Sequence, residues 1–166
     1  MSAPWLRPLH RGRGDARPTA PVTVVLASTG SPISEAAVDR AASLADGNLT
    51  AVVSIARVHG SAFGLPNPGL LPTRRERAEQ RAIVSAAIDA LARRNVEADG
   101  QVITTRNPGR SITRTARDRA ASYVVLDAPQ QGRLRRLIEG DPVRALRRGL
   151  ANRATLIVIS AQADHG

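Results

Sequence analysis

The 166-residue chain contains no cysteine, which excludes disulfide bonds, thiol catalysis and metal sites built on thiolates. Aromatic residues are almost as scarce: Trp5, Phe63 and Tyr123 are the whole set. Three scattered rings provide no platform on which single-stranded bases could stack. No apolar run approaches the roughly 20 residues that span a bilayer, and no apolar segment follows the arginines and prolines of residues 1–20 as it would in a secretory signal. We therefore expect a cytoplasmic protein without a membrane partner.

Lysine is absent as well, so all 24 basic residues are arginine, a bias typical of an alanine-rich chain from a GC-rich genome. Residues 1–20 hold four arginines and one aspartate, residues 21–105 hold eight arginines and eight acids, and residues 106–153 hold twelve arginines and four acids. One half of the folded part is therefore neutral and the other is strongly basic. The basic half is interpreted first as a solvated surface. Polyanion binding is a further alternative, either to an acidic protein or to a phosphate backbone without sequence preference.

Residues suited to catalysis or metal binding are few. The three histidines, His10, His59 and His165, lie far apart and lack the spacing of metal ligands. Ser31 and Ser34 have no nearby histidine in the sequence that could activate them as nucleophiles. Carboxylates could attract Mg²⁺, but a magnesium site would need a phosphate cradle beside them. We expect neither an enzyme nor a metal site.

The chain divides by composition into three parts. Residues 1–20, rich in arginine, proline and glycine, predict a flexible basic arm; residues 21–162 predict one folded domain; residues 163–166 form a tail. Within the domain, residues 59–72 predict a long loop. Ser34 predicts the N-cap of a helix ending near Ala45, and Thr73 with Glu76 predicts a capping box. Asp141 and Pro142 predict the start of the last helix.

Strands and helices alternate along the domain. Apolar runs predict strands at residues 22–27, 49–58, 101–105, 123–126 and 155–160, and the first, fourth and fifth of these are apolar enough for burial on both faces. Apolar residues at helical spacing separate them, in the third helix Ile112, Ala116 and Ala120. The preceding triplet Asn107, Pro108 and Gly109 predicts a turn. Such alternation predicts an α/β fold with a doubly wound, parallel, five-stranded sheet and right-handed crossovers.

Several motifs in this order resemble the universal stress protein family. Thr29, Gly30 and Ser31 stand where that family usually has Asp-Gly-Ser. The segment from Asn107 to Ala116 resembles its G-x-P-x-x-x-I-x-x-x-A helix entry. The last strand, Leu-Ile-Val-Ile, resembles its C-terminal end. The resemblance covers residues 22–160. It implies a flavodoxin-like, Rossmann-like fold related to the adenine nucleotide alpha hydrolases, and a homodimer formed through the last strand.

The same resemblance locates a nucleotide site that is degenerate in this chain. Family members carry G-x-x-G, nine residues, then G-S or G-T after the fourth strand. Here Asp127 and Gln130 replace the first two glycines, Gly140 remains, and Asp141 replaces the hydroxyl residue. Side chains and a proline without an N–H donor thus replace a loop that would approach phosphates closely.

The expected crevice lies at the carboxyl ends of the first and fourth strands. It comprises Thr29, Gly30, Ser31, Asp127, Gln130, Gly140 and Asp141. Arg133, Arg135 and Arg136 could still hold phosphate there through bidentate guanidinium contacts.

Two principal hypotheses follow. The first is a regulatory or binding protein that lacks the family's usual ATP site and uses no cofactor. The alternative is a stress sensor for an adenine nucleotide, either ATP or a less charged ligand such as a cyclic monophosphate. Polyanion binding through the arginine-rich half is a second alternative, although nucleic acid is not the expected partner because the bases would find no aromatic platform.

Overall fold

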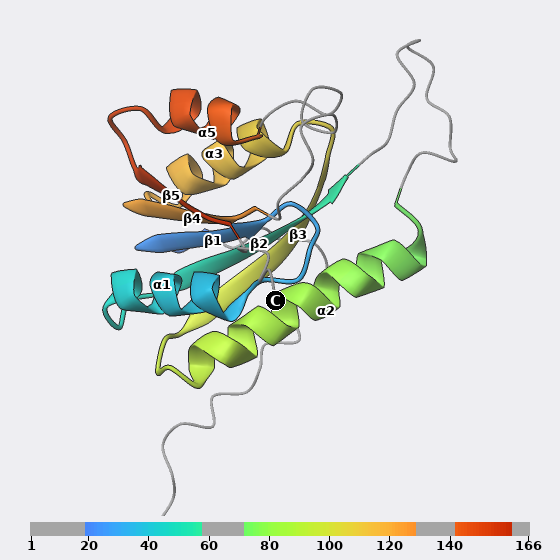
Figure 1. Cartoon of the computed structure of the whole chain (residues 1–166), viewed down its shortest axis with the longest axis horizontal. Helices are drawn as coiled ribbons and strands as arrows, with labels where there is room; N and C mark the ends of the chain where they lie inside the picture. The colour runs from blue at the N-terminus through green and yellow to red at the C-terminus, as the bar shows by residue number, and fades with distance from the viewer. Residues whose placement is uncertain (1–18, 58–71, 129–141, 161–166) are drawn as a thin grey trace, which may run out of the picture.

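The computed structural model describes residues 19–57, 72–128 and 142–160 (Figure 1). Their strands form one parallel five-stranded sheet in the order β3-β2-β1-β4-β5, which confirms the predicted α/β topology. The strands are β1 (Val24–Ser28), β2 (Thr50–Arg57), β3 (Ala98–Thr105), β4 (Tyr123–Asp127) and β5 (Thr155–Ile159). The helices are α1 (Glu35–Ala45), α2 (Arg74–Ala92), α3 (Pro108–Asp118) and α5 (Pro142–Leu150).

The strand order reverses at β1, which lies at the centre of the sheet between β2 and β4. Ser28, the last residue of β1, stands in register with Ser54 of β2 and Asp127 of β4. At such a reversal the connections leave toward opposite faces of the sheet, so a crevice opens at the carboxyl ends of the central strands. The topology therefore brings the segment after β1 close to the end of β4, as the sequence predicts.

Among the described helices, α1 and α2 cover one face of the sheet, and α3 and α5 cover the other (Figure 1). Strand β1 supplies both cores, because successive side chains of a strand point to opposite faces. Val25 and Ala27 pack in the core under α3 and α5, and Val24 and Leu26 pack in the core under α1 and α2. All four are fully buried, which explains the continuous apolar sequence of this strand.

The helix starts follow the predicted caps. Ser34 Oγ accepts a hydrogen bond from the Ala37 amide at 3.3 Å. Thr73 and Glu76 form the expected capping box at the start of α2. Helix α5 begins at Pro142, as predicted, although its expected cap Asp141 lies outside the described residues. The predicted arm, the long loop and the tail also lie largely or wholly outside the described residues, so the division into three parts stays a prediction.

Other details of the prediction are wrong. The triplet that begins at Asn107 is not a separate turn: Asn107 caps α3 by accepting from the Arg110 amide at 3.2 Å, and Pro108 is already helical. Ala120 is exposed beyond the end of α3, in a left-handed conformation with φ of 50°. Strand β3 begins at Ala98 instead of residue 101.

Strand β5 differs from the expected doubly buried strand. Thr155 is exposed and the four apolar residues after it are only partly buried. The cause is topological, because β5 pairs with β4 alone and lies at one edge of the sheet. The described chain thus leaves an apolar edge strand, the kind of edge that invites pairing with another chain.

Candidate functional site

The crevice at the carboxyl ends of β1 and β4 brings together the four predicted site residues that the structure describes. Thr29, Gly30 and Ser31 follow β1 directly, and Asp127 ends the neighbouring strand β4. The other predicted contacts at this site lie outside the described residues: Gln130, Arg133, Arg135, Arg136, Gly140 and Asp141. Within the described residues, the crevice therefore consists of the β1 side and Asp127.

Asp127 is the central group of this crevice. Its side chain is buried, with the residue 5% exposed, and its Oδ2 accepts a hydrogen bond from the Ser34 amide at 2.5 Å. In α2 the corresponding bond is local, because Glu76 Oε2 accepts from the Thr73 amide at 2.6 Å. Helix α1 has Ala37 at the position that Glu76 occupies in α2, so a carboxylate from β4 completes the cap instead.

This cap has an electrostatic consequence for the crevice. The N-terminus of a helix attracts anions through its free amides and its dipole. At α1 that attraction is already satisfied by the carboxylate of Asp127. The β1 side of the crevice therefore presents a buried negative charge at the place where a phosphate would otherwise be stabilised.

A polar network fixes the β1–α1 turn from the other side. Gln80 of α2 donates from Nε2 to the Gly30 carbonyl at 3.1 Å, and its Oε1 accepts from the Ser54 hydroxyl of β2. The Ser28 hydroxyl donates to the Ser31 carbonyl within the turn. Gly30 has φ of 106°, and a Cβ there would lie 3.1 Å from the Ile55 carbonyl oxygen. Glycine is therefore required by both conformation and space.

Sequence reasoning missed Gln80, Ser54 and the second role of Ser34. The only local signal was a serine within an otherwise apolar strand at Ser28 and again at Ser54. Both are fully buried, and buried hydroxyls need partners. Nothing in the sequence named Gln80, because its partners lie 26 and 50 residues away.

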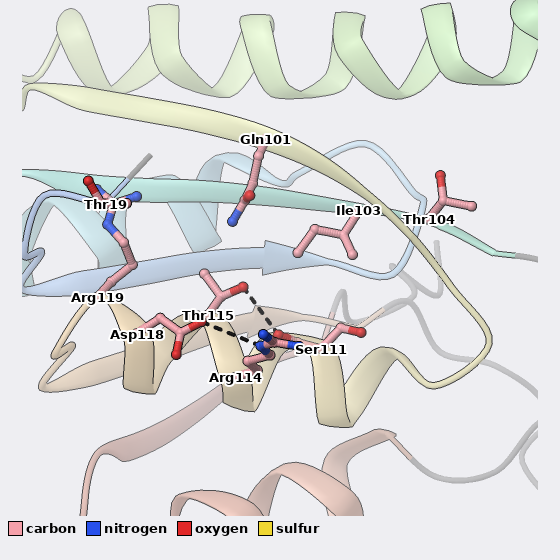
Figure 2. Close-up of a pocket in the computed structure, with 9 residues that line it drawn as sticks. All are labelled: Thr19, Gln101, Ile103, Thr104, Ser111, Arg114, Thr115, Asp118 and Arg119. Carbon is pink, nitrogen blue, oxygen red and sulfur yellow. Dashed lines mark hydrogen bonds and ion pairs between the residues drawn. The ribbon is translucent and has the colours of Figure 1, made fainter. Parts of the chain in front are cut away.

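A hollow of about 350 Å³ lies between β3 and α3, away from the carboxyl ends of β1 and β4 (Figure 2). Its wall at one end is Arg119, which is 2% exposed and was not predicted as a site residue. Arg119 binds Asp99 with both terminal nitrogens, at 3.0 and 2.6 Å, and its Nε donates to the Ala20 carbonyl. It thus joins α3, β3 and the segment before β1.

The other residues that α3 contributes to this hollow are polar and paired within the protein. Arg114 lies 3.5 Å from Asp118, and the Thr115 hydroxyl donates to the Ser111 carbonyl at 3.1 Å (Figure 2). Gln101 and Ile103 of β3 form the opposite wall. The volume is at the lower end of ligand pockets, and both arginines in it already have carboxylate partners. These contacts make the hollow a structural junction.

Among the residues that the structure describes, neither location offers a metal centre. Within residues 19–57, 72–128 and 142–160, no three histidine, cysteine, aspartate or glutamate side chains gather closely enough to hold a metal ion. Among the described helices, none combines the length and the apolar character that crossing a membrane requires.

The fold agrees with comparisons to known proteins. A sequence model of the Universal stress protein family matches residues 22–151, which is most of the chain. None of the curated proteins matches the sequence.

Solved structures are similar in fold at low sequence identity. A universal stress protein from Archaeoglobus fulgidus aligns with a TM-score of 0.60 at 18% identity, covering 84% of this chain and 94% of that one. A universal stress protein in complex with cAMP aligns with a TM-score of 0.60 at 19% sequence identity, covering 86% of this chain and 99% of that one. The universal stress protein from Archaeoglobus fulgidus in complex with dAMP aligns with a TM-score of 0.55 at 17% sequence identity, covering 83% of this chain and 97% of that one. On the extent of the family match, supported by this shared fold, the chain belongs to the universal stress protein family.

Proposed function

We propose that this universal stress protein is a cytoplasmic regulatory or binding protein that catalyses no reaction and does not hold ATP in its crevice. The observation that carries the proposal is the hydrogen bond from the Ser34 amide to Asp127 Oδ2. It assigns the carboxylate a capping role and keeps a negative charge at the crevice. The absence of cysteine, and of any histidine within the described residues, supports the proposed lack of catalysis.

The size of the electrostatic effect supports exclusion of a triphosphate. Two unit charges about 4 Å apart repel by about 1 kcal/mol in water and about 4 kcal/mol near a protein surface. Mg-ATP retains negative charge on its phosphates, so the buried carboxylate opposes its binding. Replacing the Asp127 carboxylate by a neutral amide would remove this opposition, but it would also weaken the α1 cap.

An adenine nucleotide with one phosphate is the second candidate ligand. Structures of similar fold are complexes with dAMP and with cAMP, both of which carry a single phosphate group. In this chain the β1 end keeps Gly30 and Ser31 of the family's pattern, held in place by Gln80. Such a ligand would meet less repulsion from Asp127 than ATP does.

Calorimetric titration distinguishes these candidates. We expect folded wild-type protein to give no saturable heat with Mg-ATP. Saturation by Mg-ATP at one site per chain would overturn the proposed function. Saturation by cAMP or dAMP alone would support the second candidate, and Asp127→Asn, which keeps the shape and removes the charge, should then bind that ligand more tightly. Asp118→Asn, an exposed aspartate outside the crevice, is the matched control and should leave the affinity unchanged.

We further propose a homodimer that pairs the free edge of β5. The edge carries Leu156, Ile157, Val158 and Ile159, which are only partly buried within one chain. Pairing in a dimer would cover these apolar side chains and the unpaired backbone groups beside them. Light scattering after gel filtration should give twice the chain mass of 17.6 kDa, and a mass of one chain at micromolar concentration would remove the proposal.

A further inference from the structure

Charge is divided unequally between the two halves of the described domain. Residues 19–57 and 72–105 contain eight arginines and eight acids. Residues 106–128 and 142–160 contain nine arginines but only two acids, Asp118 and Asp127, and Asp127 is buried at the crevice. The second stretch is also the shorter one, 42 described residues against 73, so it is both richer in arginine and poorer in acids. Its excess of positive charge has both causes.

The structure places this unbalanced charge on one face of the sheet. Helices α3 and α5 lie together on that face, with no other described helix between them and the solvent (Figure 1). Six exposed arginines on and beside these helices form what we call the basic face: Arg110, Arg114, Arg117, Arg147, Arg148 and Arg153. The three on α3 follow the spacing i, i+4 and i+7, so they form one stripe along the helix.

The two helices that carry the basic face are fixed against each other. A Cβ on Gly149 would lie 2.6 Å from Thr113 Oγ1, and a Cβ on Gly109 would lie 2.7 Å from Ala145 Cβ. Arg117 also donates from a terminal nitrogen to the Gly149 carbonyl at 2.9 Å. Glycine at both crossings permits this close contact. The arginines are therefore presented on a preorganised platform, which lowers the entropy cost of binding.

The chemistry of this surface indicates the class of its partner. Every exposed apolar residue in the described segments of this half is alanine, namely Ala120, Ala145 and Ala151. A protein interface needs a buried apolar core, and a membrane-bound helix needs a larger apolar anchor. Neither α3 nor α5 contains an aromatic residue on which single-stranded bases could stack. Arginine, in contrast, binds phosphate oxygens through two parallel hydrogen bonds.

We propose that the basic face binds the phosphate backbone of double-stranded nucleic acid without reading its sequence. This inference does not depend on the crevice or on its ligand. The scarcity of aromatic residues argues against binding of single strands, whose unpaired bases need a stacking platform. A duplex keeps its bases stacked on one another and does not require such a platform. Binding of this kind depends on the number of phosphates that arginines contact, and hence on salt.

The first experiment measures fluorescence anisotropy of a labelled random-sequence 30-base-pair DNA duplex with the full-length protein across a salt series. With about five phosphate contacts, affinity should fall by more than 100-fold between about 50 and 200 mM salt. Two duplexes of unrelated sequence should bind equally. No binding at 50 mM salt, or a tenfold preference for one sequence, would contradict the proposal.

Two triple variants of equal charge then locate the surface. Arg110→Gln, Arg147→Gln and Arg148→Gln together should weaken binding at least 30-fold at 50 mM salt and reduce the salt slope by about 2.7. The matched control, Arg74→Gln, Arg77→Gln and Arg81→Gln, removes the same charge from exposed positions of α2 on the opposite face and should change affinity less than threefold. Equal losses from both variants would overturn the proposal, since only net charge would then matter.

Two other polyanions serve as competitors for the wild-type protein. Polyglutamate represents an acidic protein, and phosphatidylglycerol vesicles represent an anionic membrane. At equal concentrations of charge, the duplex should displace both. One of these competitors could bind more tightly than the duplex and lose that binding in the triple variant of Arg110, Arg147 and Arg148. The basic face would then bind a different partner, and the nucleic-acid assignment would be wrong.

Discussion

Replacing Arg119 by alanine is expected to lower the free energy of unfolding by about 2–4 kcal/mol. The side chain is buried at the C-terminal end of α3, and three of its nitrogens donate, two to the Asp99 carboxylate and one to the Ala20 carbonyl. Removing it leaves the carboxylate without its counter-charge and leaves a cavity behind. The Arg119 side chain is 2% exposed and the Asp99 side chain 29% exposed, so water can partly solvate the carboxylate left behind, but breaking this half-buried pair still costs more than breaking a pair at the surface.

Urea denaturation of matched variants tests this expectation. Arg114→Ala removes an arginine from the same helix whose ion pair with Asp118 is exposed on both sides, and it should cost about 0.5 kcal/mol or less. Arg119→Lys keeps the charge but loses the two-nitrogen contact, so its stability should lie between wild type and Arg119→Ala. If Arg119→Ala costs no more than Arg114→Ala, the junction of α3, β3 and the segment before β1 does not stabilise the fold.

The regular parts of the fold could be predicted because their causes are local. The apolar run of β1 indicates burial on both faces of the sheet. The Thr73–Glu76 capping box indicates the start of a helix from a pattern only four residues long. Alternation of such elements leaves few topologies for a parallel sheet. Errors arose where one residue type serves two local structures. Asn107 and Pro108 are frequent in turns, but asparagine is also a good N-cap and proline a good first helical residue.

The contacts of the candidate site could not be predicted, because their partners are distant in the sequence. Arg119 and Asp99 are 20 residues apart, and on the sequence alone Arg119 is one of many arginines. No role was predicted for Gln80, whereas it joins the Gly30 carbonyl to the Ser54 hydroxyl. The crevice itself was predictable from topology, since the carboxyl ends of neighbouring parallel strands must meet.

The position of Asp127 could be predicted from the sequence, but its hydrogen bond could not. Its place at the crevice was predicted from its position directly after an apolar strand, and the register of β1 with β4 sets it opposite Ser28. Its hydrogen bond to Ser34 spans 93 residues and could not be read from a local pattern. On the sequence alone, Asp127 is a residue that stands where the family has glycine. In the structure its carboxylate caps α1, which gives a structural reason for a carboxylate at this position.

Asp127→Ala should therefore destabilise the protein by about 2 kcal/mol, because the partly buried Ser34 amide loses its charged acceptor. Asp127→Asn keeps an acceptor oxygen of the same shape and should cost less than half as much. Asp118→Ala, at an exposed position, should cost about 0.5 kcal/mol or less. Urea denaturation gives all three values, and equal stabilities for the alanine variants at 127 and 118 would show that the long-range cap contributes nothing.

The same alanine variant tests whether the carboxylate occupies an anion site at the start of α1. With Asp127 removed, the Ser34 amide loses its acceptor, and this amide and the α1 dipole can attract an external anion. Inorganic phosphate should then raise the melting temperature of Asp127→Ala by several degrees over chloride at equal ionic strength, while wild type and Asp118→Ala respond equally to both salts. A phosphate effect of the same size in wild type would mean that Asp127 does not block the crevice, and the argument against ATP binding would lose its physical basis.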